Sequence, residues 1–258
     1  MTVFSSPLAR RWFRRYGVAT APAGRLLCFP PAGAAAGFYR RWGSFAPPGL
    51  EILAVQYPGR EDRIAEPLCD GMAALADGIA GAAATLTDLP LALFGHSMGA
   101  AVAFEVARRL EGAGVRVEHL FVSGRPPPHR QRPKTIHRQD DDGIIAEVVR
   151  LGGTARAVLE NEDLRAFVIP QIRNDFRLSE TYEGRIAPPV RAPLSVFIGD
   201  ADSEVSADEA ADWAAGTTGT FTLASYAGGH FYLNDHTARL VRDLAARLPR
   251  HAPWLCTP

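Results

Sequence analysis

The chain has 258 residues, with 28 Lys and Arg residues against 28 Asp and Glu residues and a formal net charge of zero. Hydrophobic residues make up 47% and charged residues 22%, an ordinary mixture for one globular domain over residues 1–258. Zero net charge argues against a general nucleic-acid binder or a protein of membrane surfaces. Lys134 is the only lysine, and its Pro-Lys-Thr context excludes a Walker A loop and disfavours Schiff-base chemistry.

The cysteines predict neither a disulfide framework nor a zinc site. Cys28, Cys69 and Cys256 are odd in number, far apart and without C-x-x-C spacing, so a reducing cytoplasm is the expected location. No apolar run approaches the roughly 18 residues of a membrane span, and the charged N-terminus lacks the apolar stretch of a secretory signal. We therefore expect a cytoplasmic protein without a membrane partner.

Short apolar runs alternate with longer helical patterns along the chain. The runs lack strict polar alternation, which is typical of strands buried on both faces. Strand–helix alternation of this kind predicts an α/β fold with a mostly parallel central sheet and helices on both faces. The expected strands are 25–29, 51–55, 91–94, 119–122, 194–198 and 221–223, and the clearest helices are 72–85, 98–110 and 237–248.

One segment, approximately 125–192, interrupts this alternation. It begins with a Pro- and Arg-rich stretch and then shows two helical apolar stripes, the second of which contains Pro170. We expect Pro170 to kink or delimit that helix. The segment is either an additional helical layer or a lid over a site at the strand ends, and its position favours a helical lid insertion.

Gly95-His96-Ser97-Met98-Gly99 lies directly between an expected buried strand and an expected helix. This is the G-x-S-x-G nucleophile elbow in the context that it requires. Glycines on both sides of the serine allow a sharp turn, and the serine hydroxyl then projects above the sheet at a helix N-terminus. Ser97 is therefore the expected nucleophile.

A serine nucleophile needs a base, and the base needs an orienting carboxylate. In proteins with this elbow the serine is followed along the chain by the acid and then by the histidine. His230, in Gly228-Gly-His-Phe, follows the last expected strand and is favoured over His236. The acid is expected after the strand 194–198, where Asp202 occupies the exposed position of the turn. Asp200 is the alternative and is expected to brace that turn instead.

The oxyanion hole needs two backbone N–H donors. Met98, directly after the nucleophile, is expected to supply one. The other should come from the loop after the first strong strand, Phe29-Pro-Pro-Ala-Gly33. Because prolines have no N–H, Ala32 is the first candidate donor in this loop and Gly33 is the alternative.

These motifs together resemble the type II (stand-alone, editing) thioesterases of polyketide and nonribosomal peptide biosynthesis. The resemblance runs over roughly 12–248, although Pro31 and Ala34 stand where the family often has histidine and glycine. It rests on five segments in the same order: Phe29-Pro-Pro-Ala-Gly, Gln56-Tyr-Pro-Gly-Arg60, Gly95-His-Ser-Met-Gly, Gly199-Asp-Ala-Asp and Gly228-Gly-His-Phe.

The resemblance implies an α/β-hydrolase fold with a helical lid, and hydrolysis of acyl thioesters on the phosphopantetheine arm of acyl or peptidyl carrier proteins. Such an enzyme removes aberrant or stalled acyl groups and requires no metal or bound cofactor. A general carboxylesterase or lipase, an acyltransferase on the same fold, and a catalytically silent carrier-binding module are the alternatives.

The zero net charge combines unlike regions. Residues 1–50 contain seven arginines and no acid, residues 119–139 contain four arginines and Lys134 and no acid, and residues 192–238 contain seven acids and no Lys or Arg. We expect the basic stretch to contact an acidic carrier protein. The candidate docking residues are Arg125, Arg130 and Arg132.

Overall fold

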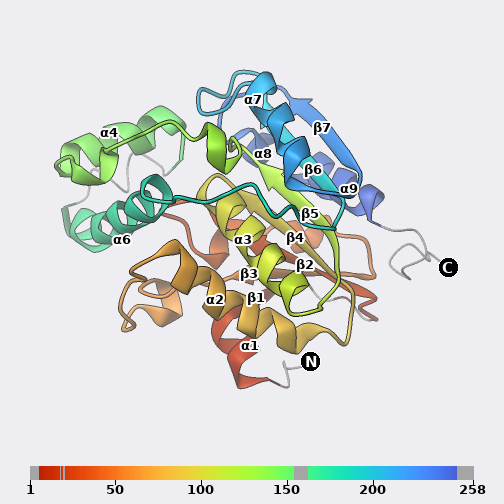
Figure 1. Cartoon of the computed structure of the whole chain (residues 1–258). Helices are drawn as coiled ribbons and strands as arrows, with labels where there is room; N and C mark the ends of the chain where they lie inside the picture. The colour runs from red at the N-terminus through yellow and green to blue at the C-terminus, as the bar shows by residue number, and fades with distance from the viewer. Residues whose placement is uncertain (1–5, 18, 20, 154–161, 249–258) are drawn as a thin grey trace.

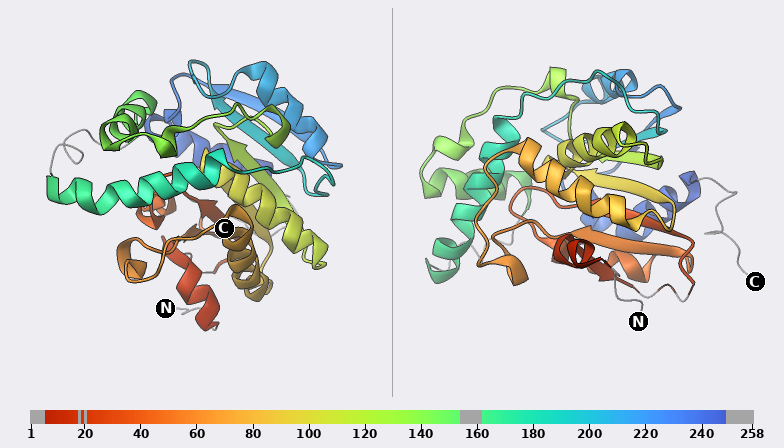
Figure 2. Two further views of the ribbon diagram at one scale, coloured as in Figure 1. Left: turned by 60° about the vertical axis from the view of Figure 1, so that its left-hand side comes forward. Right: turned by 60° about the horizontal axis from the view of Figure 1, so that its bottom comes forward.

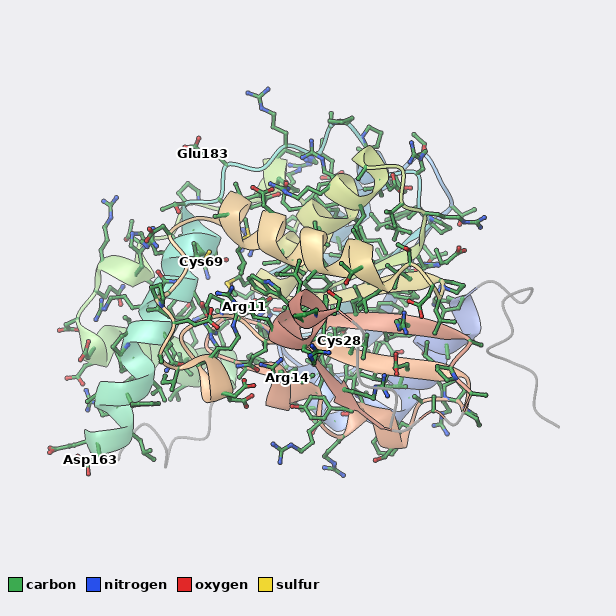
Figure 3. The ribbon with its side chains drawn as sticks, turned by 90° about the horizontal axis from the view of Figure 1, so that it is seen from below. Arg11, Arg14, Cys28, Cys69, Asp163 and Glu183 are labelled. Carbon is green, nitrogen blue, oxygen red and sulfur yellow. The ribbon has the colours of Figure 1, made fainter. Side chains whose placement is uncertain are left out.

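The computed structural model describes residues 6–17, 19, 21–153 and 162–248. Part of the expected insertion, 154–161, and Cys256 lie outside the described residues. Cys28, within the sheet, and Cys69, beside a long helix of the insertion, are both free thiols (Figure 3).

In the described part of the chain, a seven-stranded sheet with the order β1-β3-β2-β4-β5-β6-β7 forms the centre of the molecule (Figure 1). Strands β2 to β7 run parallel, and β1 joins the edge antiparallel to β3. The strands are β1 Phe13–Tyr16, β2 Gly24–Phe29, β3 Leu50–Val55, β4 Leu91–His96, β5 Val117–Ser123, β6 Leu194–Gly199 and β7 Phe221–Tyr226.

The six strands expected from apolar runs are present, each within a few residues of its expected ends. Strand β1 was not expected, because Phe-Arg-Arg-Tyr has no apolar run. It forms because Phe13 is buried and its backbone pairs with the exposed edge of β3, while Arg15 pairs with the buried carboxylate of Glu51 at 2.7 Å.

Helices cover both faces of the sheet (Figures 1 and 2). Helices α1, α2, α3 and α7 contribute to the larger apolar core on one face, and α8 and α9 contribute to a second core on the other. This arrangement confirms the α/β class predicted from the sequence. These helices are α1 Pro7–Trp12, α2 Met72–Ala83, α3 Met98–Gly112, α7 Ala207–Ala211, α8 Tyr232–Asp235 and α9 Thr237–Arg247.

Two helices of the insertion, α4 (Asp141–Leu151) and α6 (Glu162–Glu180), lie beyond the sheet at one side of the molecule (Figure 2). Asp140 caps α4 by accepting a hydrogen bond from the Gly143 N–H at 2.9 Å. Of the two outcomes expected at Pro170, a kink or a helix end, the helix end does not occur, because α6 continues through this proline. The missing proline N–H removes only one hydrogen bond from a 19-residue helix.

The inserted helices form a small apolar core of their own, separate from the two cores of the sheet. Their amphipathic stripes face each other and the end of the sheet, which accounts for the apolar periodicity of this segment. The buried members of this core are Ile144, Val148, Ile169, Ile172 and Phe176.

Candidate active site

Ser97 lies in a sharp turn between β4 and α3, with φ 55° and ψ −119°. The turn is possible only with glycines on both sides. A Cβ at Gly95 would lie 2.0 Å from the Gly99 carbonyl oxygen, and a Cβ at Gly99 would lie 2.0 Å from the Phe29 carbonyl oxygen. The Ser97 N–H donates to the Ser123 carbonyl at 2.8 Å, which holds the turn against the neighbouring strand. The strained serine of the elbow is therefore built by local sterics.

The structure brings Ser97, His230 and Asp202 into one hydrogen-bonded line. His230 Nε2 lies 3.0 Å from Ser97 Oγ, and its Nδ1 lies 3.0 Å from each carboxylate oxygen of Asp202. The side chains of Asp202 and His230 are 0% and 3% exposed. The three residues follow β4, β6 and β7, whose carboxyl ends meet at the same edge of the parallel sheet.

The two alternatives for acid and base lie elsewhere in the same loops. Asp200 accepts a hydrogen bond from the Gly228 N–H at 2.9 Å and so braces the loop that carries His230. This loop passes so close to β6 that a Cβ at Gly199 would lie 2.3 Å from the Gly228 carbonyl oxygen. His236 is hydrogen bonded through Nε2 to the carbonyl of Ala227 at 2.9 Å, outside the Ser97–His230–Asp202 line.

The loop after β2 passes beside the nucleophile. Ala32 and Ser97 together line two adjacent cavities, so the backbone of this loop borders the reacting hydroxyl. The Gly33 N–H, the alternative oxyanion donor, already donates to Asp175 Oδ2 at 2.8 Å. Met98 is the first residue of α3, fully buried directly after Ser97. This arrangement favours Ala32 over Gly33 as the partner of Met98.

A cavity of about 260 Å³ opens next to Ser97 between the sheet edge and the inserted helices. Its walls are mainly aliphatic and aromatic, which suits an apolar ligand group. Its lining includes Phe38 and Phe231 from the sheet side and Val148, Leu151, Ile172 and Phe176 from α4 and α6.

A second cavity of about 90 Å³ meets the first at Ser97 and His230. Its lining holds more polar and charged residues than that of the first cavity, including Arg132, Lys134 and Glu204, together with apolar residues such as Leu151 and Phe176. The nucleophile therefore lies between an apolar cavity and a more polar one.

His96, next to the nucleophile, points away from it into the protein. Its Nδ1 lies 2.9 Å from the Ser123 hydroxyl, and its ring centre is 4.9 Å from that of His230. Complete burial, together with the neighbouring His230, lowers the pKa of His96 well below its ordinary value. His96 is therefore neutral at physiological pH and places no positive charge beside His230.

The candidate docking arginines do not form one exposed group. Arg125 is buried, donates to Ser179 Oγ at 2.7 Å, and its carbonyl accepts from the Trp213 indole at 2.8 Å. Burial lowers its pKa to about 10. Because Arg125 is buried, it is not part of an exposed docking surface, contrary to the expectation from the sequence. Arg130 and Arg132 have side chains that are 56% exposed and are paired with Asp212 and Glu209.

Arg60 and Asp175 form a buried ion pair beside the loop after β2, and the sequence did not indicate it. Arg60 belongs to the Gln56-Tyr-Pro-Gly-Arg60 motif, which indicates a family resemblance but no role for the arginine. Asp175 lies on the buried face of α6, three residues after Ile172 and one before Phe176, and carries no motif. The two residues are 115 positions apart, so sequence spacing contained no signal for their contact.

A parallel sheet, a serine elbow and a buried histidine and carboxylate at the same sheet edge define the class of α/β-hydrolases. Within that class, residues 24–248 match the family model of the thioesterase domain. The chain belongs to the thioesterase family, which confirms the resemblance expected from its motifs.

Individual relatives agree with this assignment. The chain is 43% identical over 243 residues to a probable cadicidin biosynthesis thioesterase of Streptomyces griseus, covering 93% of this chain but only 66% of that protein. It is 41% identical to the thioesterase PikA5 of Streptomyces venezuelae, covering 92% of this chain and 85% of PikA5.

A solved structure is similar over nearly the same range. The structure of BorB, a type II thioesterase from the borrelidin biosynthetic cluster, matches with a TM-score of 0.84 and 42% identity, covering 92% of this chain and 98% of BorB. The homologues of this chain thus include type II thioesterases of polyketide and nonribosomal peptide pathways. No helix among the described residues is long and apolar enough to cross a bilayer.

Proposed function

We propose that this chain hydrolyses acyl thioesters from the phosphopantetheine arm of acyl or peptidyl carrier proteins, and so removes aberrant or stalled acyl groups in polyketide or nonribosomal peptide biosynthesis. The observation that carries the proposal is the hydrogen-bonded line from Ser97 through His230 to Asp202, beside an apolar cavity. A cytoplasmic location is part of the proposal and is supported by the free thiols of Cys28 and Cys69.

In this mechanism the Ser97 hydroxyl attacks the thioester carbonyl while His230 Nε2 takes its proton. Asp202 accepts the Nδ1–H hydrogen bond, which fixes the tautomer and stabilises the imidazolium that forms. The backbone N–H groups of Ala32 and Met98 bind the oxyanion of the tetrahedral intermediate.

Collapse of this intermediate breaks the carbon–sulfur bond, and His230 gives its proton to the leaving phosphopantetheine thiol. A water molecule then attacks the acyl-serine ester while His230 takes its proton, and His230 returns this proton to Ser97 Oγ as the carboxylic acid leaves. The apolar cavity would hold the acyl chain, and the polar cavity would admit the pantetheine arm. None of these proposed steps requires a metal or a bound cofactor.

The segment 125–192 acts as a lid in this proposal, within a single domain over 1–258. Helices α4 and α6 supply one wall of the apolar cavity, so a substrate acyl chain would lie beneath them. An additional helical layer without a role in binding would not need to border the nucleophile. Removal of water from the acyl chamber is the expected benefit of the lid.

The Ser97→Ala variant tests the proposal. We expect kcat for an acyl-carrier protein to fall by at least ~10³-fold, because the variant cannot form the acyl-enzyme. The parent should be labelled at Ser97 by a fluorophosphonate and the variant should not. Ser206→Ala, which removes only a cap of the surface helix α7, is the matched control and should keep parental activity.

Substrate comparison separates this function from its rivals. The parent should release free acid from acyl-carrier protein, observed by mass spectrometry, faster than it hydrolyses p-nitrophenyl esters. Preference for the small esters would favour a carboxylesterase or lipase, and transfer of the acyl group to an acceptor other than water would indicate an acyltransferase. Near-parental activity of Ser97→Ala would show that Ser97 is not the nucleophile.

A further inference from the structure

Asp175 of α6 reaches from the inserted segment to the loop that borders the nucleophile. Its side chain is 1% exposed. Oδ2 accepts a hydrogen bond from the Gly33 N–H at 2.8 Å, so the carboxylate holds the backbone one residue after Ala32. The contact is tight, because a Cβ at Gly33 would lie 2.9 Å from Ile172 Cγ1, one turn earlier on α6.

Arg60 completes the same arrangement from the opposite side. It binds Asp175 through two hydrogen bonds, Nη1 to Oδ2 at 2.7 Å and Nη2 to Oδ1 at 2.8 Å. Nη1 also donates to the Ala34 carbonyl at 2.9 Å. The Arg60–Asp175 pair therefore holds the N–H of Gly33 and the carbonyl of Ala34, on the C-terminal side of Ala32.

The N-terminal side of the same loop is held by two buried tyrosines. Tyr39 donates to the Phe29 carbonyl at 2.8 Å, and Tyr57 donates to the Pro30 carbonyl at 3.1 Å. Ala32 is thus enclosed between fixed backbone groups, while its own side chain makes no polar contact. Of these fixing groups, only Asp175 belongs to the inserted segment.

We propose that Asp175 is a positioning residue, which with Arg60 fixes the loop 30–34 so that the Ala32 N–H points at the developing oxyanion. The inference rests on the proposed serine mechanism and adds a coupling to it. When α6 is seated, Asp175 orders the oxyanion loop, and displacement of α6 removes the acceptor of the Gly33 N–H. The oxyanion hole is then correctly formed only while α6 is packed against the loop 30–34.

Loss of Asp175 should lower kcat more than it weakens substrate binding. The Asp175 carboxylate contacts backbone and Arg60, and it is not among the residues that line the two cavities at Ser97. A shift of a backbone N–H by about 1 Å lowers the rate steeply, because the oxyanion exists only in the transition state and intermediate. Ground-state binding of the acyl chain should change little.

The test is a double variant, Asp175→Leu with Arg60→Met, which removes both charges together. Replacing both partners avoids an unpaired buried charge, which would unfold the site for reasons unrelated to catalysis. We expect kcat to fall about 10- to 100-fold, with KM changed by less than about threefold. Asp141→Asn is the control and should behave like the parent, because it breaks only an exposed ion pair between α4 and Arg173 of α6.

Two inhibitors separate positioning from mere stability. A trifluoromethyl ketone forms an oxyanion upon addition of Ser97, so its affinity should fall in parallel with kcat. An acyl-pantetheine amide mimics the ground state and should bind the parent and the double variant within about threefold of each other. If the double variant does not fold, Asp175→Glu, which keeps the charge but displaces the carboxylate, is measured in the same way.

The outcomes distinguish this inference from the proposed function. If the parent neither hydrolyses acyl thioesters nor binds the ketone, the proposed function fails. If the parent does both, and the folded variant retains kcat and ketone affinity within about twofold, the positioning role is overturned and the serine mechanism stands. A loss of kcat without a loss of ketone affinity would overturn it as well.

Discussion

Single residues at the sheet edge differ in role although they lie within a few positions of one another. The side chain of Asp202 is fully buried and accepts from His230 Nδ1, so the exposed turn position expected for it is corrected. Asp200 is the exposed one and accepts from the backbone N–H of Gly228. One carboxylate orients the imidazole, and the other only braces the loop that carries it. Chemical identity therefore decides less than the direction in which the turn aims each side chain.

This difference predicts unequal effects of the same substitution. We expect Asp202→Asn to lower kcat by ~10³- to 10⁴-fold, since the amide favours the wrong tautomer of His230. Asp200→Asn should lower it by less than about tenfold, because an amide oxygen still accepts from the Gly228 N–H. Steady-state hydrolysis of an acyl thioester, with melting temperatures to check folding, measures both. A more severe loss in Asp200→Asn would reverse our choice of the acid.

Among the elements, α4 is tied to the loop that carries the acid. Lys134 pairs with Glu204 at 2.5 Å and with Glu147 of α4 at 3.3 Å, and Arg150 of α4 pairs with Glu204 at 2.6 Å. Burial opposes ionisation of Glu204, but hydrogen bonds from Lys134 and Arg150 outweigh it and lower its pKa. The cluster is therefore charged at neutral pH and fastens α4 to the loop two residues beyond Asp202.

We expect Glu204→Gln to loosen α4. The lost pairs are partly exposed and worth about 1 kcal/mol together, so amide hydrogen exchange over 141–151 should become roughly fivefold faster. Because the folded-state pKa lies below the ordinary value of 4.5, the contact stabilises above that pH and is lost as pH falls through the folded-state pKa.

Asp142→Asn is the matched control for this loosening, since its carboxylate is exposed and pairs with Arg165 of α6. Its exchange over 141–151 should stay near that of the parent. Equal exchange in Glu204→Gln and the parent would show that the ionic cluster does not restrain α4.

Across the whole molecule, the zero net charge is balanced locally as well as in total. The basic stretch 119–139 and the acidic stretch 192–238 lie against each other, through Arg130–Asp212 at 2.6 Å and Arg132–Glu209 at 2.7 Å. These pairs are more than half exposed on the arginine side, so they contribute little stability and exchange partners readily. A carrier protein with acidic groups could compete for them.

We expect the double change Arg130→Glu and Arg132→Glu to raise KM for a carrier-bound acyl substrate about tenfold, with a free acyl thioester affected less than about twofold. Arg116→Glu serves as the control, because Arg116 is exposed and precedes β5 at the edge of the sheet opposite to Ser97. Equal effects on both substrates would show that these two arginines are not part of the docking surface.

Much of the fold and the central residues of the candidate site could be predicted from the sequence, because they depend on neighbouring residues. Buried strands show as short apolar runs, and the elbow around Ser97 needs glycines at fixed offsets, which the contacts of Gly95 and Gly99 explain. The serine, the acid and the histidine then meet because their strands are parallel and the carboxyl ends of these strands share one edge.

Tertiary structure alone decided the features that join distant segments. Strand β1 exists because it can pair with β3, Arg125 is buried because Trp213 and Ser179 surround it, and Asp175 reaches Arg60 and Gly33 because α6 packs across the end of the sheet. Backbone sterics and hydrophobic periodicity act over a few consecutive residues and can be recognised in sequence. The partner of a buried charge depends on how whole elements pack, and no local pattern records it.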